Sequence, residues 1–200
     1  MVSTFIAQNR IAISRLFWLG ALIALLLTEK MYAGRLIGNL LPMAGLVLIG
    51  IAVVGRLWCS LYIGGRKNSE LVTEGPYSMT RNPLYFFSLL GFVGIGFCTR
   101  SISFSVCVLA FFVLVYPSVI ASEEAFLRAR FGAVFEAYCE RTPRFFPSVA
   151  RYRASEVCEV RIQQFRRTAG DVIWFVWLAG IVALVEALRP MLVQPLLTVP

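Results

Sequence analysis

The sequence contains no histidine among its 200 residues. This absence excludes every imidazole general base, every Ser-His or Cys-His dyad and the mixed Cys–His zinc sites. The five cysteines form no Cys-x-x-Cys pair, and three of them lie in or beside apolar runs, where cysteine is an ordinary small filler. We therefore expect no metal site. Any chemistry must come from carboxylates, arginines, tyrosines, the backbone or a cofactor.

Acidic residues are also scarce, with 11 against 19 basic residues and a net charge of +8. With the N-terminus inside, 15 of the Lys and Arg residues lie on the cytoplasmic side of the apolar runs and four lie outside. This asymmetry is typical of membrane proteins, whose basic surfaces meet anionic inner-leaflet headgroups. It argues against nucleic acid as a partner, and no basic and aromatic interleaving favours one.

The chain is 58% hydrophobic with a mean hydropathy of +0.76. A helix crosses the hydrocarbon core with about 20 apolar residues. The sequence therefore predicts an all-α, integral-membrane helical bundle of about five transmembrane helices in a bacterial inner membrane, its third and fourth helices joined tightly through Arg100. The first run is expected to stay as a span, because TEKMYAGR offers no signal-peptide cleavage site. The apolar runs cover residues 16–27, 36–63, 83–98, 102–120 and 172–188.

We expect one membrane domain over residues 1–200, because no linker or repeat divides it. Its parts are a core at 70–147, a basic interfacial segment at 148–170 and a last span at 171–190. Within the core, a helix is expected to begin near Ser122 as its N-cap, or else to continue the fourth span.

Three groups of polar residues interrupt the apolar pattern, and each has a plain structural explanation. Gly75-Pro76-Tyr77 is typical of a turn. Asn82-Pro83 suits a helix start, with Asn82 as N-cap and Pro83 in the first turn. Arg81 is not explained in this way, and its partner is either a headgroup phosphate or a ligand carboxylate. The adjacent acids Glu123 and Glu124 require a cation nearby, which is either Arg81 or a small molecule.

Taken together, these motifs resemble the integral-membrane methyltransferases that include isoprenylcysteine carboxyl methyltransferase and the phospholipid N-methyltransferases. Many members carry Arg-His-Pro where this chain has Arg81-Asn82-Pro83, and a second Tyr where it has Phe135. The matching residues are Leu71-Val72, Gly75-Pro76-Tyr77, Arg81-Asn82-Pro83-Leu84-Tyr85, Glu123-Glu124, Leu127, Phe131-Gly132, Tyr138 and Pro143-Arg144-Phe145-Phe146-Pro147.

The resemblance implies S-adenosyl-L-methionine as cofactor, bound at the cytoplasmic boundary, and a lipid-like or small hydrophobic acceptor with a carboxylate, amine or thiol. An amine acceptor would need a glutamate as base. The implied catalytic residues are Glu123, Glu124 and Arg81. The implied cofactor-binding residues are Gly75, Tyr77, Arg81, Asn82, Pro83, Tyr85, Glu123, Glu124, Tyr138 and Arg144.

Two other functions compete with this one. A non-catalytic membrane scaffold could keep the fold while Asn82 replaces the usual histidine. A membrane reductase using NADPH is the other, although the P-N-Y-x-x-E arrangement of such enzymes is not found in the sequence.

Overall fold

The computed structural model describes residues 19–20, 28–30, 36–66, 69–154, 160, 162–192 and 197–199, and these are almost entirely helical. Two three-residue strands, β1 (Thr28–Lys30) and β2 (Leu197–Val199), pair in parallel. The expected all-α membrane bundle is confirmed. The helices are α2 (Leu36–Ile63), α3 (Pro76–Met79), α4 (Pro83–Cys98), α5 (Ile102–Phe131), α6 (Ala133–Arg141), the short 3₁₀ helix η1 (Val149–Arg151) and α7 (Ile162–Leu192).

Among the described residues, three helices are long and apolar enough to cross a membrane: α2, α5 and the part of α7 from Thr168 to Leu188. The fourth apolar helix, α4, is shorter at 16 residues. Most of the predicted first span, residues 16–27, lies outside the described residues. The predicted hairpin between the third and fourth spans is confirmed, because Arg100, with a φ of 56°, lies in the short turn between α4 and α5.

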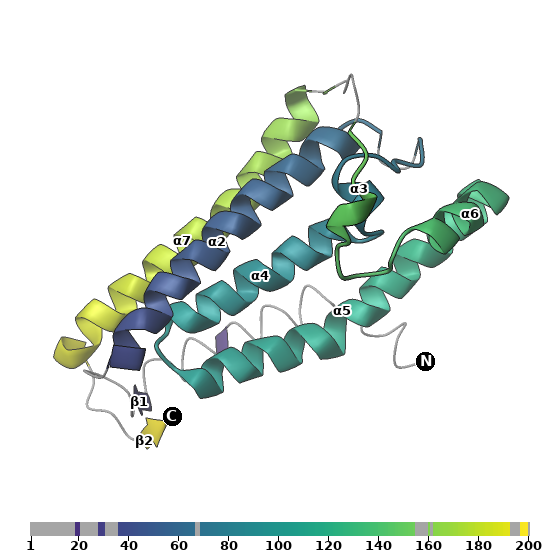
Figure 1. The fold of residues 1–200 in the computed structure, drawn as a ribbon. Helices are drawn as coiled ribbons and strands as arrows, with labels where there is room; N and C mark the ends of the chain where they lie inside the picture. The colour runs from purple at the N-terminus through teal and green to yellow at the C-terminus, as the bar shows by residue number, and fades with distance from the viewer. Residues whose placement is uncertain are drawn as a thin grey trace.

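Helix α4 lies between α2 and α5, and α7 packs against both α2 and α4 (Figure 1). The α2–α4 contact depends on glycine. A Cβ on Gly45 would lie 2.6 Å from the Gly94 carbonyl oxygen, and one on Gly94 would lie 2.7 Å from the Gly45 oxygen. Small residues are the usual means of close helix packing in lipid, where helix association gains little from the hydrophobic effect.

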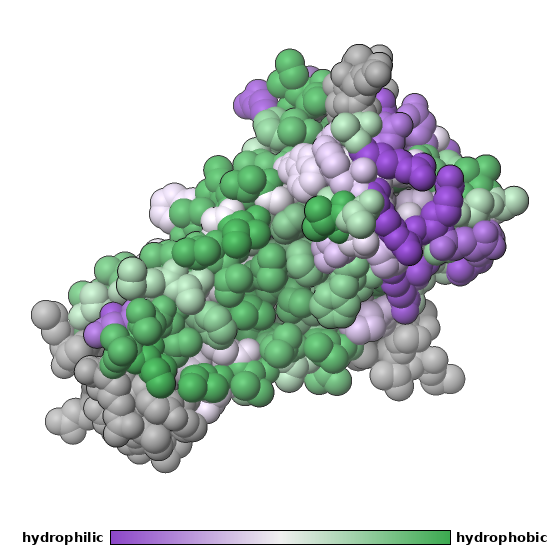
Figure 2. Space-filling view, viewed as in Figure 1, coloured by the Kyte–Doolittle hydropathy of each residue, from purple (hydrophilic) through white to green (hydrophobic). Residues whose placement is uncertain are grey.

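Polar side chains gather at one end of the bundle, near α3 and α6, while the middle shows mainly hydrophobic residues (Figure 2). The strands β1 and β2 lie at the opposite end (Figure 1). We call the end formed by residues 69–82 and 122–154 the polar end. It collects the segments that carry all three sequence motifs, although these are separated by two helices in the chain.

The acidic pair does not start a helix. Helix α5 is continuous from Ile102 to Phe131, and the Ser122 hydroxyl donates to the Val119 carbonyl instead of capping. The prediction of a helix N-terminus at Ser122 is therefore wrong, and the alternative, a continued fourth span, is correct. Gly132, with a φ of 50°, ends α5 and permits the turn into α6.

Helix α7 begins at Ile162, before the predicted last span at 171–190. Residues 162–170 of the predicted interfacial segment therefore belong to the same helix as that span. Earlier in this segment, η1 and residues 152–154 lie on the polar end. Residues 155–159 and 161 lie outside the described part of the chain.

Candidate functional site

The Gly75-Pro76-Tyr77 motif forms the tight start of α3. Gly75 has a φ of 58°, and a Cβ there would lie 2.3 Å from the ring of Tyr62. Its amide donates to the Arg153 carbonyl at 2.8 Å, which ties the motif to the segment after η1. A larger residue at position 75 would therefore be strained by the positive φ and would clash with the Tyr62 ring. The glycine positions Tyr77, which is buried.

Asn82 and Pro83 begin α4 as the sequence predicts, but the amide of Asn82 does not cap the helix. Its Nδ2 donates to Glu124 Oε1 at 3.1 Å and to the Arg144 carbonyl at 2.9 Å. The expected capping bond is thus replaced by bonds to two segments far away in the sequence. Asn82 joins the start of α4 to α5 and to the segment after α6.

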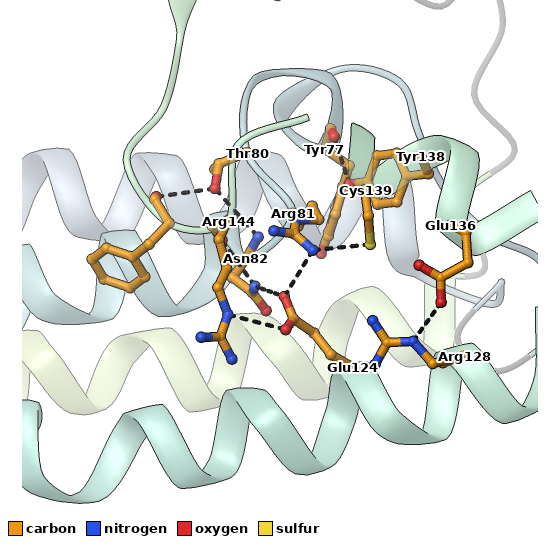
Figure 3. Close-up of polar contacts among 11 residues, drawn as sticks. Tyr77, Thr80, Arg81, Asn82, Glu124, Arg128, Glu136, Tyr138, Cys139 and Arg144 are labelled. Carbon is orange, nitrogen blue, oxygen red and sulfur yellow. Dashed lines mark hydrogen bonds and ion pairs between the residues drawn. The ribbon is translucent and has the colours of Figure 1, made fainter. Parts of the chain in front are cut away.

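Glu124 lies at the centre of a set of charged groups (Figure 3). Only 8% of it is exposed, and it accepts bonds from Arg144 Nε at 3.0 Å and from Asn82. Arg81 Nη1 lies 3.5 Å from Glu124 Oε1 and 2.9 Å from Cys139 Sγ. We call Arg81, Asn82, Glu124 and Arg144 the Glu124 cluster. Its residues come from three segments of the predicted core: the start of α4, helix α5 and the segment after α6.

Beside the cluster lies a cavity of about 240 Å³. Seven of the ten predicted site residues line it, while Glu124 and Arg144 lie in the cluster and Gly75 lies at the turn before α3. The cavity wall also carries two charged residues that the sequence argument did not assign, Arg56 and Glu70. The lining residues are Arg56, Ile63, Glu70, Leu71, Val72, Tyr77, Arg81, Asn82, Pro83, Leu84, Tyr85, Glu123, Leu127 and Tyr138.

Among the described residues, three buried polar atoms around this cavity lack a hydrogen-bond partner. They are Arg56 Nε, Tyr77 Oη and Arg81 Nε, and all three residues line the cavity. A buried donor left unpaired costs about 1–3 kcal/mol, and such groups are rare in folded proteins. All three therefore lie where a polar ligand in the cavity could complete their hydrogen bonding.

The two tyrosines of the cavity outside the membrane-spanning helices are held in the neutral form. Burial raises the pKa of Tyr77 well above its usual value, and it raises the pKa of Tyr138 as well. The Tyr138 hydroxyl donates to the Tyr77 carbonyl at 2.7 Å. Tyr138 is thus already engaged within the protein, whereas the Tyr77 hydroxyl is available to hydrogen-bond a ligand. Neither is suited to act as a phenolate base.

The adjacent acids have different surroundings. Glu123 lines the cavity and its Oε2 accepts a bond from the Tyr85 hydroxyl at 2.8 Å. Glu124 is not among the lining residues and is bound by two guanidinium groups. Of the two glutamates that the sequence nominated, Glu123 is therefore the one that can face a ligand in the cavity.

Arg56 could have been found from the sequence, because it interrupts the apolar run 36–63. An ionisable residue within a membrane span marks a functional site by default. In the charge asymmetry it is one of the 15 basic residues on the cytoplasmic side, whereas the structure places it inside α2. Glu70 carried no comparable signal. In the described part of the chain, no group of three or more Cys, Asp and Glu side chains is placed to hold a metal ion.

Comparison with known proteins agrees with this arrangement. The sequence model of the phospholipid methyltransferase family matches residues 43–134, which include α4, most of α2, α5 and both glutamates. The chain is 39% identical over 181 residues to the cobalt-zinc-cadmium resistance protein CzcN of Cupriavidus metallidurans, an alignment that covers 90% of this chain and 83% of that protein.

It is also 39% identical over 188 residues to the nickel-cobalt-cadmium resistance protein NccN of Alcaligenes xylosoxydans xylosoxydans, covering 94% of this chain and 88% of that protein. No solved structure matches the chain. Both alignments cover at least 90% of this chain, so the likeness extends well beyond the motifs. The chain belongs to the phospholipid methyltransferase family of integral-membrane proteins.

Proposed function

We propose that the protein transfers a methyl group from S-adenosyl-L-methionine to a lipid-like or otherwise hydrophobic acceptor, with the polar end on the cytoplasmic side. The observation that carries this proposal is the cavity lined by Glu123, Tyr77 and Arg81, around which buried polar atoms lack partners. Membership of a methyltransferase family supports it.

The residues of the cavity fit this cofactor chemically. Its sulfonium and amino groups are cations, and Glu70 and Glu123 supply carboxylates at the cavity wall. Its carboxylate suits the free Nε of Arg81. The neutral hydroxyl of Tyr77 can hydrogen-bond the ribose or adenine. The cavity is slightly smaller than the 300–1,000 Å³ usual for small-molecule sites, and residues 70–72 line it from an irregular segment that can shift.

The cofactor, when bound, supplies a methyl group already activated by its sulfonium. The protein then contributes mainly position and the exclusion of water. The Glu124 cluster acts through Arg81 and Asn82, which it fixes at the edge of the cavity. Glu123 offsets positive charge, and for an amine acceptor it would also take up the proton released. A carboxylate or thiolate acceptor requires no base.

Binding of S-adenosylhomocysteine and of NADPH to the purified protein, measured by calorimetry in detergent, tests the cofactor. We expect the former to bind and the latter not to bind. Glu123→Gln should weaken the binding of S-adenosyl-L-methionine, which carries both cations, at least tenfold, whereas Glu136→Gln, at an exposed acid paired with Arg128, should not. A wild-type protein that binds neither compound would instead support the scaffold alternative, and selective NADPH binding would support the reductase.

The acceptor can be sought by mass spectrometry of membrane lipids from cells that lack or overproduce the protein. We expect one class of lipid to gain the mass of one methylene group with overproduction. Glu123→Gln, produced at the same level, should abolish this product if the acceptor is an amine.

We further propose that this reaction serves tolerance of divalent metal ions, because both named relatives are metal resistance proteins whose names share cobalt and cadmium. Deletion of the gene should lower growth in cobalt or cadmium. The wild-type chain should restore growth, and Glu123→Gln should not. Equal restoration by both chains would separate resistance from methyl transfer.

A further inference from the structure

Arg56 places a positive charge inside an apolar helix. It lies on α2 seven residues before the helix ends at Ile63, which corresponds to about 10 Å along the axis. Helix α2 is long and apolar enough to span a membrane, so Arg56 lies deeper in the bundle than the residues of the polar end. It nevertheless lines the same cavity as Glu123.

The protein neutralises this charge only in part. Arg56 Nη1 donates to the Ser88 hydroxyl, and its guanidinium lies 5.5 Å from the centre of the Phe175 ring. Its Nε is buried without a partner. No ion pair joins Arg56 to a carboxylate in the described part of the chain. Asp171 on α7, which acts on Arg56 only through its longer-range field, is exposed.

An unpaired guanidinium at this depth is costly, so such residues usually face a ligand or a water-filled cavity. Both neighbours of Arg56 come from membrane helices, Ser88 from α4 and Phe175 from α7. A ligand group that reaches Arg56 is thus surrounded by the apolar part of the bundle. An oxyanion there would form charge-assisted bonds in a setting of low polarity, where they are strong.

We propose that Arg56 binds a carboxylate or phosphate carried by a hydrophobic molecule, which, if the proposed function holds, is the methyl acceptor. Arg81, a member of the Glu124 cluster at the polar end, also lines the cavity, and its unpaired Nε remains available for the carboxylate of the cofactor. The two arginines therefore divide the anions of the two ligands between them: the deeper one binds the amphiphile and the shallower one binds the nucleoside.

The test measures thermal unfolding of the purified protein in detergent with four probes: oleate, dioleoyl phosphatidic acid, and their neutral counterparts oleyl alcohol and dioleoylglycerol. We expect at least one anionic probe to raise the wild-type Tm by several degrees more than its neutral counterpart. A response to oleate alone assigns a carboxylate, and a response to phosphatidic acid alone assigns a phosphate. Arg56→Gln should abolish this difference, Arg56→Lys should keep part of it, and the exposed-site control Arg128→Gln should keep all of it.

The same variants are titrated with S-adenosylhomocysteine, whose affinity should change less than threefold in Arg56→Gln. The proposal is overturned if this affinity falls tenfold while the anionic shift persists, because Arg56 would then hold the cofactor. It is equally overturned if anionic and neutral probes act alike on the wild type, a comparison that needs no variant to fold. If S-adenosylhomocysteine fails to bind the wild type but the anionic shift depends on Arg56, the proposed function fails and the anion site stands.

Discussion

The Glu124 cluster and the cavity beside it share Arg81 and Asn82 but differ in how their polar groups are paired. In the cluster, Glu124 is bound by two guanidinium groups and an amide. Around the cavity, three buried polar atoms have no partner. Buried groups that are paired stabilise one arrangement, while unpaired ones raise the free energy of the ligand-free protein. The contrast separates the paired groups that hold the polar end together from the unpaired groups that, under the proposed function, bind a ligand.

The largest expected effect is on the cluster. Glu124→Ala leaves two arginines and an amide without their shared acceptor, and breaking a buried ion pair costs about 3–5 kcal/mol. Thermal unfolding in detergent should show this loss of stability. Glu123→Gln, which keeps an acceptor for Tyr85, should cost less than about 1 kcal/mol. Equal losses in the two variants would remove the distinction between cluster and cavity.

Asn82→Asp should have the next largest effect. It removes the donor to Glu124 and places a second carboxylate about where Nδ2 now lies, 3.1 Å from Oε1. We expect a loss of about 2–3 kcal/mol at neutral pH, since hydrogen bonds to charged groups contribute about 1.5–3 kcal/mol. Asn82→Ala should cost less, and the gap between the two variants should close below about pH 4, where the new carboxyl protonates. A gap that persisted there would mean that steric misfit, not charge, causes the loss.

Tyr77→Phe should have smaller effects, which differ in sign between folding stability and ligand affinity. Removing an unpaired buried hydroxyl should leave the stability of the free protein unchanged or raise it by up to about 1 kcal/mol. The affinity for S-adenosylhomocysteine should fall roughly three- to tenfold, equivalent to one lost hydrogen bond. A variant that is less stable, yet binds S-adenosylhomocysteine as before, would show that the hydroxyl stabilises the fold and does not bind the ligand.

The contribution of Tyr77 and Tyr138 to folding stability is expected to change with pH only in alkaline solution. Burial raises the pKa of Tyr77 and Tyr138 in the folded state, so the unfolded chain loses its phenolic protons first, near pH 10. Stability is therefore unaffected by these groups below about pH 10 and falls above it, by about 1.4 kcal/mol per pH unit for each tyrosine. Unfolding in urea between about pH 8 and 11 measures this slope, and Tyr77→Phe should halve the tyrosine contribution.

Much of this arrangement could be predicted from the sequence, because hydrophobic runs and motifs are local signals. Run lengths predict the helical bundle and the hairpin at Arg100. Residue types predict the first turn of α4 at Pro83 and suggest Arg81 as a partner of the acidic pair. The sequence could not predict that Glu123 lines the cavity while Glu124 pairs with the arginines. It depends on the direction in which each side chain leaves α5, and hence on whether that helix is continuous.

The role of Asn82 was also beyond the sequence. An asparagine before a proline has a sufficient local explanation as a helix cap, and nothing nearby in the chain shows that its amide reaches Glu124 and the Arg144 carbonyl. The role of Arg56 could not be predicted for a different reason. Its position inside an apolar run was visible, but only the packing of α2 against α4 and α7 shows that it lacks a carboxylate partner.

The unbroken course of α5 makes the polar end mechanically dependent on the bilayer. Its 30 residues extend from the turn at Arg100 to Phe131 and include Pro117, so the acidic pair belongs to the same helix as the apolar side chains before it. A bilayer that is thinner or thicker than the apolar length of such a helix changes its tilt. A change of tilt would displace Glu123 relative to Arg56 on α2, so we expect the shape of the cavity that both residues line to depend on acyl-chain length.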